Sequence, residues 1–166
     1  MPLKGDEVQE KLKAIKLFLF DLQGTLIPEN DNGEIIPADL IEKLSEFGGF
    51  CNGRNMKCGI ITGIENGKLL DAIKKLGVIE LAPASLDKVS AAEKIAAGFG
   101  CSLDETFYMG DGILDVPLLT KAGLSTAPKS ASRQIKKSVD FICPENNGAE
   151  RLDYILSLMK RIEVET

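Results

Sequence analysis

The sequence predicts an α/β fold: a doubly wound, parallel sheet of six strands with helices on both faces. Two observations lead to this fold class. Six short apolar runs, each about the length of one buried strand, alternate with stretches of helical periodicity. Parallel strands need long crossover connections, and the helical stretches between the runs supply them. The doubly wound strand order is then 3-2-1-4-5-6, with right-handed crossovers.

The first half of the chain alternates between helical and strand-like patterns. Val8, Leu12 and Ile15 recur at helical spacing and predict a short amphipathic helix over residues 6–15. The segment PENDNGEIIP at 28–37 is rich in turn-forming residues. The other elements predicted in this half are strands at 16–20, at 57–61 and near 79–81, a helix with Leu40, Ile41, Leu44 and Phe47 on one face, and a helix with Leu69, Leu70, Ile73 and Leu76 that ends at Gly77.

The second half continues this alternation up to an amphipathic C-terminal helix. Gly100 and Gly123 each follow a helical stretch directly, in the position of a common C-terminal cap. The elements predicted in this half are a helix at 89–99, a strand at 106–109, a helix at 113–122, strands at 124–127 and 139–143, and a last helix with Leu152, Ile155, Leu156 and Met159 on one side.

Size and composition restrict the classes of function. With 166 residues, the chain is expected to form a single domain over 1–166. A net charge of −5 argues against nucleic acid or a membrane surface as a partner. No apolar run approaches the roughly 20 residues of a membrane span, and the charged N-terminus lacks a signal-peptide core, so a cytoplasmic location is expected. The chain has no histidine, which removes the usual general base near neutral pH.

Carboxylates follow the two strands between which the winding of the predicted sheet reverses. Asp21 comes directly after the first strand, and Asp111 and Asp115 lie in YMGDGILD after the fourth. Ligands of such sheets bind outside the carboxyl ends of the strands at this reversal. Three carboxylates that meet there stay ionised together only with a cation between them. Oxygen ligands with open positions suit Mg²⁺.

Phosphate-binding groups are predicted at the same edge of the sheet. Thr62 in ITGIENG follows the second strand and offers a hydroxyl, and backbone N–H groups of the 63–67 turn can hold a phosphate. Lys88 precedes the next helix and can balance the charge of a phosphoryl group. Together with Asp21 as a nucleophile, these groups suit phosphoryl transfer. Taken singly, Asp21 is better explained as a helix cap or turn former, Thr62 as a cap of the next helix, and Lys88 as a solvated surface charge.

In order and spacing, FDLQGTL, IITG, Lys88 and MGDGILD resemble the four motifs of the haloacid dehalogenase superfamily. The resemblance covers nearly the whole chain. It is strongest to the capless group typified by 3-deoxy-D-manno-octulosonate 8-phosphate phosphatase, through GDGILDVP, AGLSTAP and NNGAER. It implies a three-layer, Rossmann-like fold without a separate cap domain, and a Mg²⁺-dependent reaction through an aspartyl phosphate. It also implies a phosphorylated small-molecule substrate and a homotetramer.

The resemblance assigns a role to each site residue. Asp21 is the nucleophile and a metal ligand. Asp111 binds Mg²⁺ directly, Asp115 supports the metal through water or through Lys88, and the backbone carbonyl of Gln23 is the third protein ligand. The residues implied to bind the transferring phosphoryl group or the rest of the substrate are Thr62, Gly63, Lys88 and Arg151.

The chain departs from the family pattern at the position of the general acid and base. Phosphatases of the family carry a second aspartate where this chain has Gln23, and commonly an arginine where it has Ile64. An amide neither protonates a leaving group nor activates water, and such help is typically worth about 10²–10⁴-fold in rate. The sequence thus predicts a phosphatase-like hydrolase of weakened activity, acting on a sugar phosphate.

Three alternative functions compete with this one. The first is a catalytically impaired pseudoenzyme that binds phosphate ligands or serves in assembly, and Gln23 and Ile64 favour it. The second is a dinucleotide-binding domain, but the first loop, DLQGTL, lacks the GxGxxG pattern that such a domain needs. The third is a signalling receiver domain, which the carboxylate spacing and the length fit less well.

Overall fold

The computed structural model describes residues 2–165. The strands of this part of the chain form a single six-stranded sheet. Its order is β3-β2-β1-β4-β5-β6, and every pair of neighbours is parallel, so the predicted order 3-2-1-4-5-6 is confirmed. The strands are β1 (Leu17–Asp21), β2 (Lys57–Ile61), β3 (Ile79–Ala82), β4 (Thr106–Met109), β5 (Leu124–Pro128) and β6 (Phe141–Cys143).

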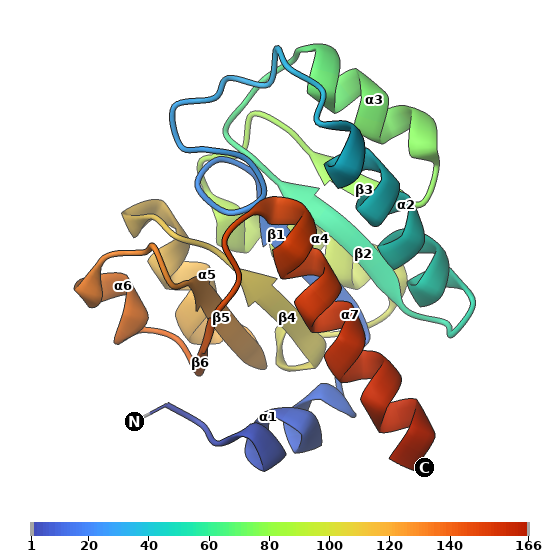
Figure 1. Ribbon diagram of the computed structural model, residues 1–166, viewed down its shortest axis with the longest axis vertical. Coiled ribbons are helices and arrows are strands. Elements are labelled where there is room, and N and C mark those ends of the chain that lie inside the picture. Colours follow the sequence, from blue (N-terminus) through green and yellow to red (C-terminus); the bar gives the residue numbers. More distant parts are fainter. Residues whose placement is uncertain (1, 166) are drawn as a thin grey trace.

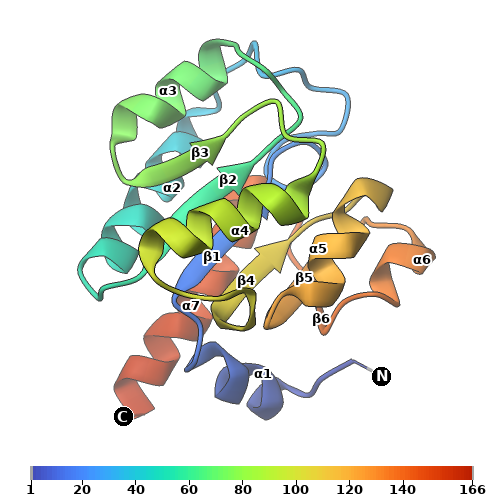
Figure 2. The same ribbon diagram turned by 180° about the vertical axis from the view of Figure 1, so that it is seen from behind.

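Helices cover both faces of this sheet and make a three-layer structure (Figures 1 and 2). In Figure 1 α2 and α7 lie in front of the sheet, and in Figure 2 α4 and α5 lie in front of it. Within residues 2–165 no separate cap domain interrupts this arrangement, as expected. The helices are α1 (Gly5–Leu12), α2 (Ala38–Asn52), α3 (Lys68–Leu76), α4 (Lys88–Phe99), α5 (Val116–Lys121), α6 (Arg133–Lys136) and α7 (Gly148–Glu165), with 3₁₀ turns at Leu103–Glu105 and Ile113–Asp115.

The central strand β1 is buried on both faces, and its side chains alternate between two cores. Phe18 and Phe20 belong to the core under α1, α2, α3 and α7, whereas Leu17 and Leu19 belong to the core under α4, α5 and α6. Phe18 and Phe20 each pack on Phe47 of α2 with ring centroids 5.4–5.7 Å apart. Packing on both faces explains why the strand reads as an unbroken apolar run, LFLF, before Asp21.

Some boundaries differ from the prediction. The first helix ends at Leu12 and not at residue 15, because the chain turns there to enter β1. Residues 113–115 form a 3₁₀ turn, and α5 begins only at Val116, with a proline in its first turn. The last strand begins at Phe141 and not at residue 139. The four-residue helix α6 was not predicted, since it is too short to show a helical period.

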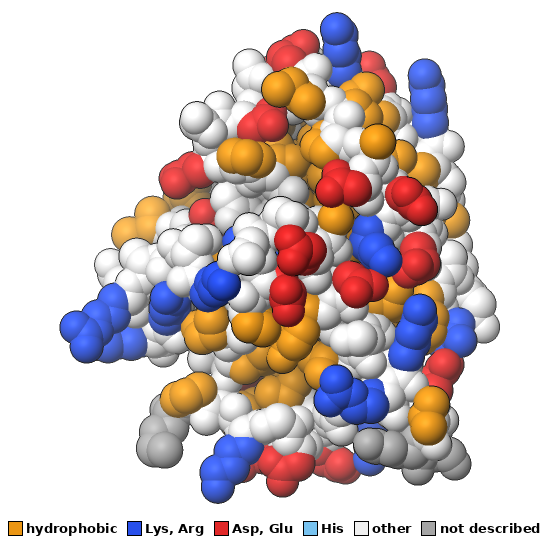
Figure 3. Space-filling view, viewed as in Figure 1, with side chains coloured by type: hydrophobic (Ala, Val, Ile, Leu, Met, Phe, Trp, Pro, Cys, Tyr) orange, Lys and Arg blue, Asp and Glu red, His pale blue; other side chains and the backbone are white. Residues whose placement is uncertain are grey.

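The surface carries charges of both signs. On the face drawn in Figure 3, acidic and basic side chains are intermingled over α2 and α7. This pattern is typical of a solvated surface and differs from the clustered basic patch of nucleic-acid-binding proteins. None of the helices within residues 2–165 combines the length and the apolar character that a membrane span requires.

Candidate active site

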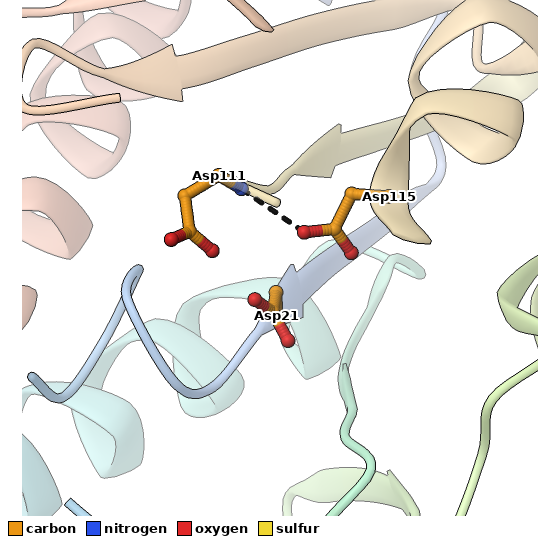
Figure 4. Close-up of side chains that lie close together, drawn as sticks. All are labelled: Asp21, Asp111 and Asp115. Carbon is orange, nitrogen blue, oxygen red and sulfur yellow. Dashed lines mark hydrogen bonds between the residues drawn. The ribbon is translucent and has the colours of Figure 1, made fainter. Parts of the chain in front are cut away.

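The three predicted carboxylates converge at the carboxyl edge of the sheet. Asp21 is the last residue of β1, and the loop that carries Asp111 and Asp115 leaves the neighbouring strand β4. One carboxylate oxygen of each residue lies within 4.8 Å of one from each of the others. Figure 4 shows the three side chains pointing toward a common space. The spatial prediction from the strand order is therefore confirmed for these residues.

The charges in this cluster fit a divalent cation. Burial, followed by the charge of Asp115, raises the pKa of Asp21 to about 8, and Lys88 only partly offsets this shift. Burial also raises the pKa of Asp111. Crowded, buried carboxylates of this kind are stabilised in their ionised form by a cation. The ligands are all oxygens, so the donor set suits a hard ion such as Mg²⁺.

Asp115 differs from the other two carboxylates because protein donors occupy both of its oxygens. Its Oδ2 accepts hydrogen bonds from the backbone N–H groups of Asp111 and Gly112, both at 3.0 Å. Its Oδ1 accepts from the Lys88 ammonium at 2.7 Å and from the Tyr108 hydroxyl at 2.5 Å. These contacts suit a support for the metal site, acting through Lys88 and the Asp111 loop, better than a direct ligand.

Lys88 contacts both Asp21, the candidate nucleophile, and Asp115. It is the first residue of α4, and its buried ammonium lies 2.7 Å from Oδ1 of both Asp21 and Asp115. Burial alone lowers the pKa of Lys88, but the two carboxylates raise it by more, so the group stays charged. The helix begins here because the carboxylate of Asp87 accepts a hydrogen bond from the N–H of Ser90, a common N-cap contact.

Thr62 lies one residue beyond β2, beside the end of β1. Its side chain is buried, and its N–H donates to the Ala82 carbonyl at 3.0 Å. Its hydroxyl accepts a hydrogen bond from the N–H of Ile64 at 3.1 Å, so the hydroxyl proton can be directed to a ligand. Gly63 follows immediately and adds a backbone N–H to this turn.

Gln23 contacts the segment that follows it. Its side-chain amide donates to the carbonyl of Asp31 at 2.7 Å. Its backbone forms an isolated bridge with Ile27, in which the N–H of Gly24 donates to the Ile27 carbonyl at 2.7 Å. Both contacts fix the loop between Asp21 and Asp31, so the side chain of Gln23 has a structural partner within this loop.

Gly24 leaves room for Asp111. Its φ is +81°, which favours glycine, and a Cβ atom there would lie 1.9 Å from Oδ2 of Asp111. We expect Gly24→Ala to weaken Mg²⁺ binding at least about tenfold, because the added methyl group would displace the carboxylate of Asp111. A loss of about 1.4 kcal/mol in binding free energy corresponds to that factor. Titration calorimetry measures this affinity. Gly49→Ala is the matched control, since a Cβ atom on that helical glycine meets nothing within 4 Å; equal losses in both variants would contradict the assignment.

Arg151 lies in the wall of a cavity of about 550 Å³ that reaches Asp111. Its guanidinium donates to the carbonyls of Thr25, Glu145 and Asn146 at 2.8, 3.3 and 3.1 Å. It therefore ties the start of α7 to the loop after β1. The structure brings Arg151 to the edge of the candidate site, where its guanidinium hydrogen-bonds to neighbouring groups of the protein.

Comparison with known proteins places the chain in a family. Residues 65–150, more than half of the chain, match the model of a haloacid dehalogenase-like hydrolase. The chain belongs to this family. The match begins after Asp21, so the nucleophile candidate rests on the geometry of the carboxylate cluster.

Relatives and solved structures extend the likeness over nearly the whole chain. The 3-deoxy-D-manno-octulosonate 8-phosphate phosphatase KdsC of Yersinia pestis is 25% identical over 96% of this chain and 89% of its own length. The phosphatase of that name from Moraxella catarrhalis, solved with magnesium, phosphate and KDO, superposes with a TM-score of 0.76 at 22% identity, over 96% of this chain and 95% of its own. The cobalt-bound form of the deoxy-D-mannose-octulosonate 8-phosphate phosphatase from Haemophilus influenzae superposes with a TM-score of 0.75 at 23% identity. This match covers 93% of this chain and 94% of the other. These structures share the fold.

Tyr108 was missed by the sequence reasoning. It lies in β4, within the apolar run TFYM, and this run predicts a buried strand without marking any functional residue. The one available signal was the hydroxyl itself, because a buried tyrosine needs a hydrogen-bond partner. Its partner, Asp115, lies seven residues further along the chain, and only the turn after β4 brings the two together.

Proposed function

We propose that this single-domain chain is a Mg²⁺-dependent, phosphatase-like hydrolase that takes a phosphoryl group from a phosphorylated small molecule onto Asp21. One observation carries the proposal: the buried Lys88 ammonium lies 2.7 Å from Asp21 in a cluster where Asp111 also lies within reach of one cation. A nucleophile, a fixed positive charge and a set of oxygen ligands are thereby gathered at one point. Phosphoryl transfer needs mainly this positioning and charge stabilisation.

In the first step, a carboxylate oxygen of Asp21 attacks the phosphorus, and the bond from phosphorus to the leaving oxygen breaks. The Lys88 ammonium, the Thr62 hydroxyl and the Gly63 N–H hold the phosphoryl oxygens as charge shifts onto the leaving group. Mg²⁺, held by Asp21, Asp111 and the Gln23 carbonyl, would neutralise the negative charge of the phosphoryl oxygens. Asp115 keeps Lys88 in place through its 2.7 Å contact.

In the second step, water attacks the phosphorus of the aspartyl phosphate, and the bond between phosphorus and the Asp21 oxygen breaks. Phosphate and the Asp21 carboxylate are released, and without a base at position 23 the proton of the water passes to solvent. A carboxylate at position 23 would accept the proton of that water, and it would earlier have protonated the leaving oxygen. The Gln23 amide does neither, and it already donates to the Asp31 carbonyl. We infer slow hydrolysis and a phosphorylated protein that lasts long enough to detect.

The substrate proposed is a sugar phosphate. Two observations support this: the relatives named above are phosphatases of a phosphorylated sugar acid, and a cavity of about 550 Å³ extends from Asp111 along the loop after β1 to the start of α7. A cytoplasmic location and a homotetramer stay predictions. Exposed apolar side chains favour the assembly; they are Ile35, Ile36, Leu86, Ile113 and Leu114.

Incubation with acetyl phosphate and Mg²⁺, followed by rapid quenching and intact-mass measurement, tests the proposal. We expect one phosphate adduct per chain, because acetyl phosphate has a good leaving group and needs no acid at position 23. Peptide mapping should locate the adduct on Asp21.

Asp21→Asn and Asp71→Asn provide the comparison, since Asp71 lies in α3 and outside the acidic cluster. The adduct should be lost in the first variant and kept in the second. The absence of any adduct in the wild type, under conditions where Gln23→Asp turns over, would contradict the phosphoenzyme.

The second candidate function is a pseudoenzyme that binds Mg²⁺ and a phosphate ligand without turnover. The observation that favours it is the bond from the Gln23 amide to the Asp31 carbonyl, which gives the side chain of this residue a structural role. This candidate predicts ligand binding with no hydrolysis across a broad panel of phosphomonoesters. Hydrolysis of any of them by the wild type, abolished by Asp21→Asn, would eliminate it.

A further inference from the structure

The hydroxyl of Tyr108 reaches the site from inside the sheet. The residue lies in β4, its side chain is fully buried, and it packs in the core beneath α4 and α5. A buried hydroxyl needs a hydrogen-bond partner. Its partner here is the carboxylate of Asp115 at 2.5 Å, a charged group that also holds Lys88.

Four donors determine the orientation of the Asp115 carboxylate, and they come from different parts of the fold. Two are backbone N–H groups of the loop after β4, and one is the ammonium of Lys88 on α4. Of these four donors, only the hydroxyl of Tyr108 comes from a strand of the central sheet. The hydroxyl therefore ties Asp115 to a buried strand in the middle of the sheet.

The same oxygen of Asp115 receives both the Tyr108 hydroxyl and the Lys88 ammonium. A rotation of this carboxylate would move the point to which Lys88 is held, and Lys88 in turn contacts Asp21 at 2.7 Å. Rotation would also disturb the two N–H contacts that fix the backbone at Asp111. A chain of contacts thus runs from Tyr108 to Asp21.

We propose that Tyr108 is a positioning residue for phosphoryl transfer, whose hydroxyl fixes Asp115 and through it the places of Lys88 and of the Asp111 loop. The inference rests on the proposed function. The hydroxyl of Tyr108 donates to Asp115, so the proposed effect on Asp21 passes through Asp115.

The test measures beryllofluoride binding in the presence of Mg²⁺ by ¹⁹F NMR, with no turnover needed. Beryllofluoride adds to an aspartate as a phosphoryl group does, so its affinity reports the geometry around Asp21. We expect Tyr108→Phe to bind it at least about tenfold more weakly than the wild type, while the thermal unfolding midpoint shows that the fold is kept. Tyr154→Phe, which changes the second of the two tyrosines, on α7, should bind it as the wild type does.

A double-mutant cycle separates this role from general packing. If Tyr108 acts through Asp115, Tyr108→Phe should add no further loss in an Asp115→Asn background. Wild-type affinity in Tyr108→Phe, or full additivity in the double variant, would overturn the inference alone. Failure of the wild type itself to bind beryllofluoride would contradict the proposed phosphoryl site, and with it this inference.

Discussion

Gln23→Asp is expected to increase the steady-state hydrolysis of sugar phosphates by about 10²–10⁴-fold, the usual contribution of a general acid and base. A carboxyl at this position protonates the leaving oxygen in the first step and accepts a proton from water in the second. The rest of the site is already present, because Asp21, Lys88 and Asp111 are held independently of this side chain. Phosphate release from a panel of phosphomonoesters measures the gain.

Gln23→Asn is the matched control for this gain. It has the length of aspartate but the chemistry of an amide, and like Gln23→Asp it shortens the side chain that contacts Asp31. The aspartate variant should hydrolyse the panel and the asparagine variant should not. Equal rates in the two variants would show that position 23 takes no part in proton transfer. The aspartyl phosphate should also become shorter-lived in Gln23→Asp alone.

Lys88→Met is expected to abolish phosphorylation of Asp21 and to destabilise the protein in a pH-dependent way. The substitution leaves the buried carboxylates of Asp21 and Asp115 without their shared cation. Removing one partner of a buried ion pair typically costs about 3–5 kcal/mol. Burial and the charge of Asp115 already raise the pKa of Asp21 to about 8, and loss of the ammonium raises it further.

The sign of the pH dependence follows from this raised pKa. A carboxyl whose pKa is higher in the folded than in the unfolded state stabilises the fold fully below its unfolded pKa, about 4 for aspartate. This contribution is lost as the pH rises through the pKa of the folded state, about 8 for Asp21. The destabilisation of Lys88→Met relative to the wild type should thus be smaller near about pH 5, where Asp21 is protonated in both proteins, and should grow above about pH 8, where the wild type ionises Asp21 beside the ammonium and the variant resists ionising it.

Urea unfolding in the presence of a metal chelator, at both pH values, measures this dependence. Lys129→Met, at an exposed lysine just after β5, is the control and should be neutral at both. A loss of stability in Lys88→Met that stays constant between the two pH values would contradict the role of Lys88 as the counter-charge of Asp21.

Much of the fold could be predicted from the pattern of apolar residues along the chain. Most of the candidate site could be predicted from the strand order that this pattern implies. Buried parallel strands appear as unbroken apolar runs, and β2 and β4 have the bounds predicted from KCGII and TFYM. Once the winding order is known, the carboxyl ends of β1 and β4 must lie side by side. This geometric rule alone brought Asp21 together with Asp111 and Asp115, since no feature of the local sequence links residues 90 positions apart.

The sequence by itself determined the fold class, the edge of the sheet that carries the chemistry, and the absence of an acidic side chain at position 23. Only the tertiary structure decided which partners the side chains have. In the folded protein the amide of Gln23 donates to the Asp31 carbonyl, and the guanidinium of Arg151 donates to the loop after β1. The hydroxyl of Tyr108 donates to Asp115. The reason is physical: periodicity records which residues are buried, whereas a hydrogen bond depends on distances between atoms that the folded backbone alone sets.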